Sequence, residues 1–240
     1  MPMTPTLALQ NWFGDSKVTN AEGLPLVVYR GEHGDTLAGA LRTTLPGFTF
    51  TGDREVASRY AMEPNDRLSF HYADLPRVIP AYLSIKNPVF FNLDDPFVEF
   101  SDLAELLGRP LAEKMARKHD NHVRNTGNWE ENFADQFATV DELLDARPDA
   151  LSALYVDAYV LLDDYAFVEA ARSAGFDGAG HLGNGESALL MEYRVFDRSQ
   201  IQSAIGPYGC FDAVHADAHA NTHISLADQA EQIESERPCT

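Results

Sequence analysis

The chain has 240 residues, of which 45% are hydrophobic and 23% are charged, and this composition is typical of a globular protein with a sizeable core. Its 37 acidic and 18 basic residues give a formal net charge of -19, which repels phosphate backbones and makes nucleic acid an unlikely partner. The sequence contains no apolar run of about 18 residues that could span a membrane.

The cysteines and the first residues of the chain carry information on the cell compartment. Cys210 and Cys239 lie close to one end and support no disulfide framework, as is typical of a protein made in a reducing cytosol. Residues 1–17 lack a basic region followed by an apolar core, so they do not resemble a secretory signal peptide. We therefore expect a cytoplasmic protein, or one that is delivered into a host or target cell without such a signal.

The first hundred residues are dominated by strand signals. Short apolar or alternating runs predict strands at 24–31, 48–51, 78–85 and 88–91. Between them, residues 51–62 have a helix-start signal at Asp53 and apolar residues at helical spacing. Asp53 is therefore interpreted as a helix cap rather than a catalytic base.

The middle of the chain, residues 101–173, has helical periodicity and stops at Gly175. Strand character returns at 176–182 and 188–196, followed by a short strand or turn at 200–206. The order of strands, helices and strands predicts an α+β fold with a largely antiparallel sheet. We expect one domain over residues 1–214, with 101–173 as a helical insertion, and a mobile tail at 215–240.

Several segments in this order resemble a known superfamily. EYRVFDRSQI, which begins at Glu192, resembles the strand that carries the catalytic glutamate of poly(ADP-ribose) polymerases and related mono-ADP-ribosyltransferases. GFTFTGDREVASRY, from Gly47 to Tyr60, is similar to the glycine-led strand and helix of the same superfamily, and LPLVVYRGEHG occupies the place of its first strand. AYLSIKNPVFFN and AGFDGAG are similar to segments of bacterial and phage members, and NWFGDSKVTNAEGLPLVVY resembles the ADP-ribosyltransferase domains of phage polyvalent proteins. The resemblance covers about 11–100 and 170–213.

The resemblance implies an ADP-ribosyltransferase-like split antiparallel β-sheet core, with NAD as a substrate in the cleft and no metal. In such a reaction nicotinamide leaves early, so the transition state is a ribosyl oxocarbenium cation that a carboxylate can stabilise. Glu192 is the candidate for this catalytic role, because strand alternation puts it on the opposite face from Met191 and Tyr193. From spacing alone, a solvent-facing glutamate on an edge strand would give the same pattern.

The same resemblance implies a set of NAD-binding residues at the end of the first strand, on the second strand and on the helix after it. They are Arg30, Gly31, Thr49, Thr51 and Tyr60. The planar guanidinium of Arg30 can hold a phosphate or a ribose through paired hydrogen bonds. Tyr60 either stacks on the nicotinamide ring or belongs to the core, since Val56 lies four residues earlier on the same helix face.

One position departs from the pattern of the superfamily. Arginine-modifying members usually have a glutamate two residues before the catalytic one, but this chain has Leu190 there. Arginine as the acceptor is therefore doubtful unless Glu186 or a residue of the helical middle substitutes. The expected acceptor is a protein side chain, and the rivals are water, which would make the protein an NAD glycohydrolase, and a non-catalytic module that has kept the fold.

Histidine clusters provide a weaker signal. His215, His219 and His223 would align on one helix face, but their position in the tail argues against a rigid metal site. His119 and His122 are similarly weak candidates. We expect no bound metal.

Overall fold

The computed structural model describes residues 7–32, 45–62, 76–91, 95–184 and 190–205. The chain divides into two compact units, the first formed by residues 1–86 with 190–240 and the second by 87–189. The first unit therefore contains most of the segments that carry the resemblance, and the second contains the predicted helical insertion. The sequence-based boundaries of 101–173 lie inside the second unit.

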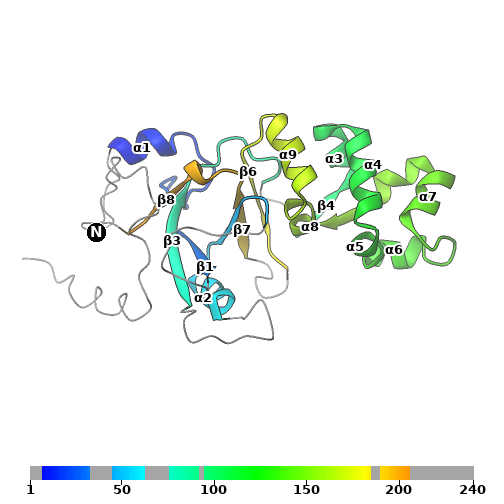
Figure 1. Cartoon of the computed structure of the whole chain (residues 1–240), viewed down its shortest axis with the longest axis horizontal. Coiled ribbons are helices and arrows are strands. Elements are labelled where there is room, and N and C mark those ends of the chain that lie inside the picture. Colours follow the sequence, from blue (N-terminus) through cyan, green and yellow to red (C-terminus); the bar gives the residue numbers. More distant parts are fainter. Residues whose placement is uncertain (1–6, 33–44, 63–75, 92–94, 185–189, 206–240) are drawn as a thin grey trace, which may run out of the picture. The chain divides into compact units, whose positions relative to one another are not determined.

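The first unit is built on an antiparallel sheet. Its strands are β1 (Val28–Glu32), β2 (Phe48–Thr51), β3 (Arg77–Leu83), β7 (Met191–Val195) and β8 (Ile201–Ser203), and they are hydrogen-bonded in the order β7-β2-β1-β3-β8 (Figure 1). All four neighbouring pairs in this order are antiparallel. The α+β class and the antiparallel sheet expected from the sequence are confirmed.

One face of this sheet holds the core of the first unit. Register places Val28 opposite Ala81, and Phe50 opposite Tyr193. Four large apolar residues of this face, Val28, Phe50, Ile79 and Leu83, are at most 3% exposed. Since side chains alternate between the two faces of a strand, the residues between them belong to the other face.

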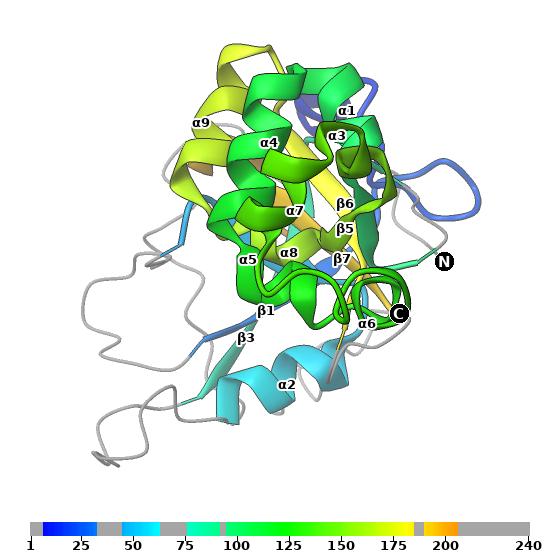
Figure 2. The same ribbon diagram turned by 90° about the vertical axis from the view of Figure 1, so that its right-hand side faces the viewer.

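Three short helical elements complete the described part of the first unit. They are α1 (Leu7–Phe13), α2 (Arg54–Met62) and the 3-10 turn η4 (Arg198–Gln200). In Figures 1 and 2, α2 lies next to β1 and β3. Asp53 caps α2 as predicted, because its side-chain oxygen accepts hydrogen bonds from the N–H groups of Glu55 (2.7 Å) and Val56 (3.0 Å).

The second unit is mainly helical. Its elements are β4 (Phe97–Glu99), α3 (Phe100–Leu107), α4 (Arg109–Lys118), α5 (Asp120–Arg124), α6 (Gly127–Asn132), α7 (Val140–Ala146), η2 (Pro148–Ala153), β5 (Tyr155–Asp157), α8 (Ala158–Leu162), α9 (Tyr165–Ser173) and β6 (Gly178–Leu182). The end of α9 follows the prediction: Gly175 has φ +93°, and the N–H of Phe176 donates to the carbonyl of Ala171 at 3.0 Å, as in a Schellman motif.

Two predictions for this unit are wrong. Residues 88–91 form no strand; Pro88 makes only an isolated bridge with Gly178, because proline has no N–H with which to extend a ladder. The segment predicted as a helix before α9 contains β5, which pairs with β4 through Val98 and Val156. Burial of both valines in this pairing outweighs the local helical pattern.

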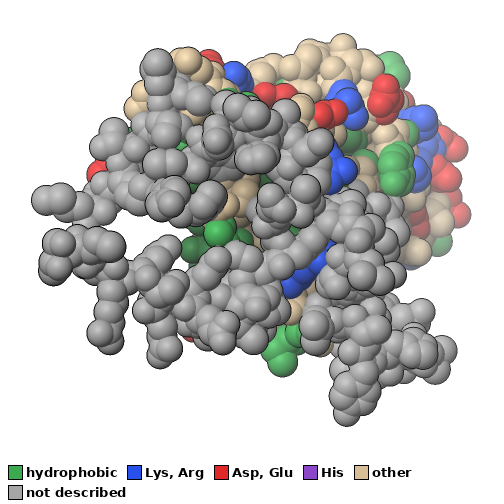
Figure 3. All heavy atoms as spheres, turned by 60° about the vertical axis from the view of Figure 1, so that its left-hand side comes forward, with side chains coloured by type: hydrophobic (Ala, Val, Ile, Leu, Met, Phe, Trp, Pro, Cys, Tyr) green, Lys and Arg blue, Asp and Glu red, His purple; other side chains and the backbone are tan. Residues whose placement is uncertain are grey.

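Charged side chains of both signs are interspersed on the described surface that Figure 3 draws. Within the described ranges, no helix is long and apolar enough to cross a membrane. The tail that contains His215, His219 and His223 lies outside the described residues.

Candidate active site

The predicted catalytic strand lies directly beside the predicted NAD-binding strand. In the antiparallel pairing of β2 with β7, Thr51 is opposite Glu192 and Thr49 is opposite Arg194. Directly opposite residues in such a pair project from the same face, with Cβ atoms about 4.5–5.5 Å apart. Thr49, Thr51 and Glu192 therefore share one face of the sheet, the face opposite the core.

Glu192 is not a solvent-facing residue of this strand. Only 9% of the residue is exposed, and its neighbour Thr51 is 5% exposed. A carboxylate that is held away from bulk water interacts more strongly with a nearby positive charge, because water screens it less. This burial is the environment that charge stabilisation in a transition state requires.

On the face that carries Glu192, α2 packs over β1. Tyr29 is opposite Thr51 in the β1–β2 pairing, so Gly31, two residues further along β1, belongs to the same face. A Cβ atom on Gly31 would lie 1.9 Å from the carbonyl oxygen of Ala57 in α2. The backbone of α2 thus rests directly on Gly31, which only glycine permits.

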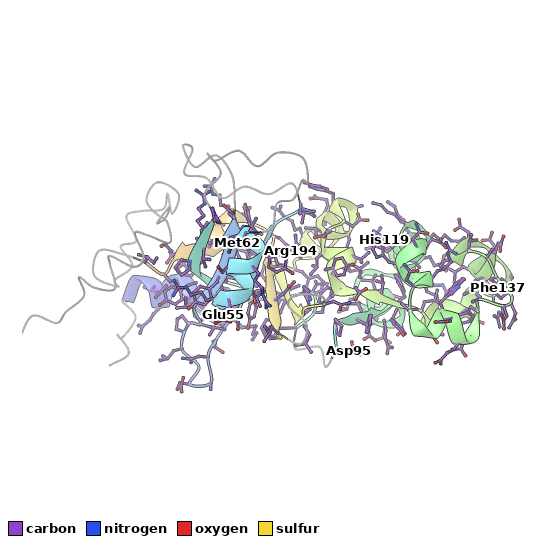
Figure 4. All side chains as sticks on the ribbon, turned by 90° about the horizontal axis from the view of Figure 1, so that it is seen from below. Glu55, Met62, Asp95, His119, Phe137 and Arg194 are labelled. Atoms are coloured by element: carbon purple, nitrogen blue, oxygen red, sulfur yellow. The ribbon has the colours of Figure 1, made fainter. Side chains whose placement is uncertain are left out.

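Tyr60 lies near the C-terminal end of α2. Tyr60 is 41% exposed, whereas the residues that anchor α2, Val56, Ala57 and Ala61, are buried. The core alternative for Tyr60 therefore does not hold in this structure. In Figure 4, Glu55 and Met62 mark the two ends of α2, and Arg194 extends from β7.

Thr51 also joins the strand to the helix. Its hydroxyl oxygen accepts a hydrogen bond from the N–H of Asp53 at 3.2 Å, and Asp53 in turn caps α2. A hydroxyl that accepts in this way still has one hydrogen that it can donate. The sequence FTFTGD thus places a hydroxyl beside Glu192 and starts the helix that carries Tyr60.

Arg30 starts from the other face of the sheet. It is opposite Ile79 of β3, and its guanidinium carbon lies 5.8 Å from the centre of the Phe48 ring. Its Nε donates to Glu32 at 2.6 Å and its Nη1 donates to the carbonyl of Thr49 at 3.0 Å. Since strand carbonyls lie in the plane of the sheet, this last bond brings the guanidinium to the junction of β1 and β2.

The structure therefore brings Gly31, Thr49, Thr51 and Glu192 to one face, and α2, which carries Tyr60, packs over β1 on the same face. The side chain of Arg30 does not project from that face; it reaches the backbone of β2 instead, and 15% of it is exposed.

Two residues of this face were missed in the sequence. Tyr29 is opposite Thr51, and Arg194 is opposite Thr49 with only 3% of the residue exposed. Arg194 Nη1 donates to the carbonyl of Pro46 at 3.2 Å, which ties β7 to the start of β2. Strict alternation from Glu192 would have identified Arg194, which is two residues further along the same strand.

The remaining candidates lie elsewhere or outside the described residues. Leu190 is 36% exposed, and Glu186 is outside the described residues. In the second unit, His119 Nε2 lies 2.8 Å from Asp164 Oδ2, and Asp164 caps α9. His119 thus contacts the residue that caps α9. The described ranges contain no group of three or more His, Cys, Asp or Glu residues arranged to hold a metal ion.

Comparison with known proteins supports the same assignment. The sequence profile of one protein family, described as ADP-ribosyltransferase in polyvalent proteins, matches residues 20–211. This match spans all of the described strands and most of the described helices. No curated protein and no solved structure matches the chain.

Proposed function

The chain belongs to the family of ADP-ribosyltransferases in polyvalent proteins, and we propose that it transfers a single ADP-ribose from NAD to an acceptor and releases nicotinamide. The observation that carries this proposal is the pairing of the two buried residues Thr51 and Glu192 on the sheet face against which α2 packs. It juxtaposes a carboxylate and a hydroxyl beside the helix of Tyr60. These are the groups that the resemblance assigns to the reaction.

Glu192 is the proposed catalytic residue. As the bond between ribose and nicotinamide breaks, positive charge develops on the ribose, and the carboxylate of Glu192 would stabilise it. The carboxylate can also accept hydrogen bonds from ribose hydroxyls. Its low exposure means that the interaction would not be weakened by bulk water.

The other predicted residues are proposed to bind NAD. Thr49 and Thr51 would shape the pocket for the nicotinamide, and Tyr60 would stack on its ring as an amphipathic plate. Gly31 would act through α2, because its lack of a side chain lets the helix that carries Tyr60 pack against β1. Arg30 would hold a phosphate or ribose from the junction of β1 and β2.

The acceptor is proposed to be a side chain of another protein, with the second unit as the part that recognises it. By analogy with bacterial and phage members of the superfamily, the protein would act as a toxin, an effector or a factor for host takeover. A cognate antitoxin would be a partner only if the protein acts as a toxin. The net charge of -19 disfavours a nucleic-acid acceptor.

Leu190 favours a second candidate function, which is hydrolysis of NAD. Where arginine-modifying members have a carboxylate, this chain has an apolar side chain that is 36% exposed. Without a base at that position, water could be the acceptor, and the products would be free ADP-ribose and nicotinamide. A third alternative is a non-catalytic module that binds NAD but does not cleave it.

The test is nicotinamide release from labelled NAD, with wild type and Glu192→Gln each assayed with and without cell lysate. Removal of the carboxylate should lower the rate of release at least about a hundredfold. Glu55→Gln, which changes an exposed glutamate on α2, is the matched control and should keep the wild-type rate.

The location of the label separates the candidates. Label on a lysate protein identifies a transferase, and label that appears only as free ADP-ribose identifies a glycohydrolase. If wild type releases no nicotinamide under either condition, or if Glu192→Gln releases it at the wild-type rate, the proposed catalytic role is wrong.

A further inference from the structure

Arg30 belongs to a cluster of charged side chains on its face of the sheet. Glu32 follows two residues later on β1 and is opposite Arg77, the first residue of β3. One oxygen of Glu32 accepts a hydrogen bond from Arg30 Nε at 2.6 Å, and the other accepts one from Arg77 Nη2 at 3.1 Å. Arg30, Glu32 and Arg77 thus form a continuous polar cluster, in which the carboxylate is shared by two guanidinium groups.

This cluster is withdrawn from water. The side chains of Glu32 and Arg77 are each 7% exposed, and that of Arg30 is 15% exposed. Charges in such surroundings interact strongly, because little solvent screens them. Removal of one member would therefore change the electrostatic properties of the other two.

The charges in the cluster determine what Arg30 can bind. If Arg30 and Glu32 formed a pair by themselves, their charges would cancel, and the pair would attract an anion only weakly. With Arg77 on the second oxygen of Glu32, two guanidinium groups share one carboxylate, and these three side chains together carry one positive charge. Arg30 then remains attractive to a phosphate even though Glu32 fixes its orientation.

Arg77 is also costly for the fold. Its Nε and Nη1 are buried, and among the described residues neither has a hydrogen-bond partner. Buried donors without partners destabilise a protein, and in native structures they usually have a functional reason. A methionine or glutamine would fill the same volume with fewer unsatisfied donors, so packing alone does not explain an arginine at the start of β3.

We propose that Arg77 is a positioning residue for NAD binding: it balances the charge of Glu32, so that Arg30 is held in place and still keeps its attraction for the diphosphate of the dinucleotide. This inference rests on the proposed role of Arg30 in binding NAD. It adds Glu32 and Arg77, which the superfamily resemblance did not indicate.

The first variant is Arg77→Gln. It leaves Glu32 with one guanidinium, so the cluster loses its positive charge and should bind anions less well. We expect the KM for NAD to rise on the order of tenfold with kcat nearly unchanged, since an unscreened charge at a distance of several ångströms contributes roughly this much. Inhibition by ADP-ribose should weaken by a similar factor, whereas inhibition by nicotinamide, which has no phosphate, should not change.

The decisive variant is the double substitution Glu32→Gln and Arg77→Gln. It removes one negative and one positive charge, which restores a net positive charge on Arg30. We expect its affinity for NAD and ADP-ribose to recover most of what Arg77→Gln loses. A purely structural role predicts the opposite, because a second substitution in a buried cluster would damage the fold further.

Two controls keep the test specific. Arg109→Gln breaks an exposed Arg–Glu pair, whose Nε–Oε1 distance is 2.8 Å, and should change neither KM nor inhibition. Thermal unfolding of each variant shows whether it is folded at the assay temperature. Where a variant is not folded there, Arg77→Lys, which keeps the charge, and Arg77→Met, which removes it, are compared instead, and only Arg77→Met should weaken ADP-ribose binding.

Failure of this inference is distinguishable from failure of the proposed function. If wild type releases nicotinamide but Arg77→Gln binds ADP-ribose as tightly as wild type, or the double variant binds worse than Arg77→Gln, the role of Arg77 is overturned. If wild type releases no nicotinamide, calorimetric titration with ADP-ribose still decides the role of Arg77. If wild type binds neither NAD nor ADP-ribose, the role of Arg77 and the proposed function are both overturned.

Discussion

Glu192 and Gly31 show how single residues can have a definite role in this chain. Glu192 occupies a buried strand in which an apolar residue would pack at lower cost, because burial of a charge requires compensation. Its partner across the strands is Thr51, and the motif that resembles the catalytic strand of the superfamily starts with it. The role of Glu192 depends on its side chain, whereas the role of Gly31 depends on the absence of one, because α2 packs directly against it.

Gly31→Ala is expected to destabilise the first unit by about 3 kcal/mol, the upper part of the range for overpacking. The new methyl group would lie 1.9 Å from the carbonyl of Ala57 and 2.8 Å from the N–H nitrogen of Ala61, so α2 would have to move away from β1. Chemical denaturation measures the free energy of unfolding. Nicotinamide release should fall as well, because α2 carries Tyr60.

Gly52→Ala is the matched control, since a Cβ atom there would meet nothing within 4 Å. It lies in the turn between β2 and α2, next to the helix that packs on Gly31. Equal losses of stability in both variants would contradict the close contact between α2 and Gly31.

At the scale of elements, α2 and α9 each begin at an aspartate that accepts backbone N–H groups. The cap of α2, Asp53, was recognisable in the sequence. The cap of α9, Asp164, has two further partners that the sequence does not indicate: Lys118, the last residue of α4, and His119, the residue after it. Lys118 Nζ lies 2.7 Å and His119 Nε2 lies 2.8 Å from Asp164 Oδ2. Burial lowers the pKa of His119 below 6.5, its ordinary value, although the hydrogen bond to Asp164 acts in the opposite direction.

This arrangement predicts that acid destabilises the second unit. Because the pKa of His119 is lower in the folded state, the unfolded chain binds more protons between the two values, and stability falls as the pH decreases from 6.5 towards the folded pKa. Burial raises the pKa of Asp164, but hydrogen bonds from Lys118, Ala166 and His119 outweigh it and lower the pKa below 3.8. The stabilisation by ionised Asp164 is therefore fully present above pH 3.8, and it is lost as the pH falls through the pKa of Asp164 in the folded state.

Measurement of the free energy of unfolding between pH 7.5 and 5 is expected to show this decrease, with a shallower slope in His119→Gln than in wild type. His122→Gln is the control, since His122 contacts the rings of His119 and Tyr159 but lies outside the cap. An identical slope in wild type and His119→Gln would contradict the assignment of the proton uptake to His119.

At the scale of the whole molecule, charge is the dominant feature. The 37 acidic residues exceed the 18 basic ones, so repulsion among like charges opposes the compact state at neutral pH. Salt screens this repulsion, and the Debye length falls from about 30 Å at 0.01 M to about 8 Å at 0.15 M. We therefore expect Tm at pH 7.5 to rise as NaCl increases over this range.

Differential scanning calorimetry measures the effect, and sucrose at matched osmolality controls for non-ionic stabilisation. The rise should be smaller at pH 5, where the chain is closer to its pI of 4.6 and carries less negative charge. A Tm that decreases with salt at pH 7.5 would show that attractive ion pairs outweigh the net repulsion.

Much of this fold was readable in the sequence, and the exceptions have physical reasons. Residues 48–51 form a strand as predicted, and α2 and the end of α9 follow their caps, because capping and alternation are local properties. The pairing of β4 with β5 was missed, since Val98 and Val156 are far apart in the chain and only burial against each other favours a strand. The bounds of the second unit also depend on contacts between distant residues. This unit begins at Asn87, whereas the helical pattern in the sequence begins only at residue 101.

The sequence by itself determined the α+β class, the family, the order of the motifs and the identity of the candidate carboxylate, because these depend on composition, periodicity and motif. Only the tertiary structure decided that Thr51 and Glu192 are direct neighbours, that α2 rests on Gly31, and that Arg30 starts from the opposite face and shares Glu32 with Arg77. The physical reason is that strand register and side-chain ion pairs join residues from distant parts of the chain. Their free energy comes from pairing and burial that no local pattern contains.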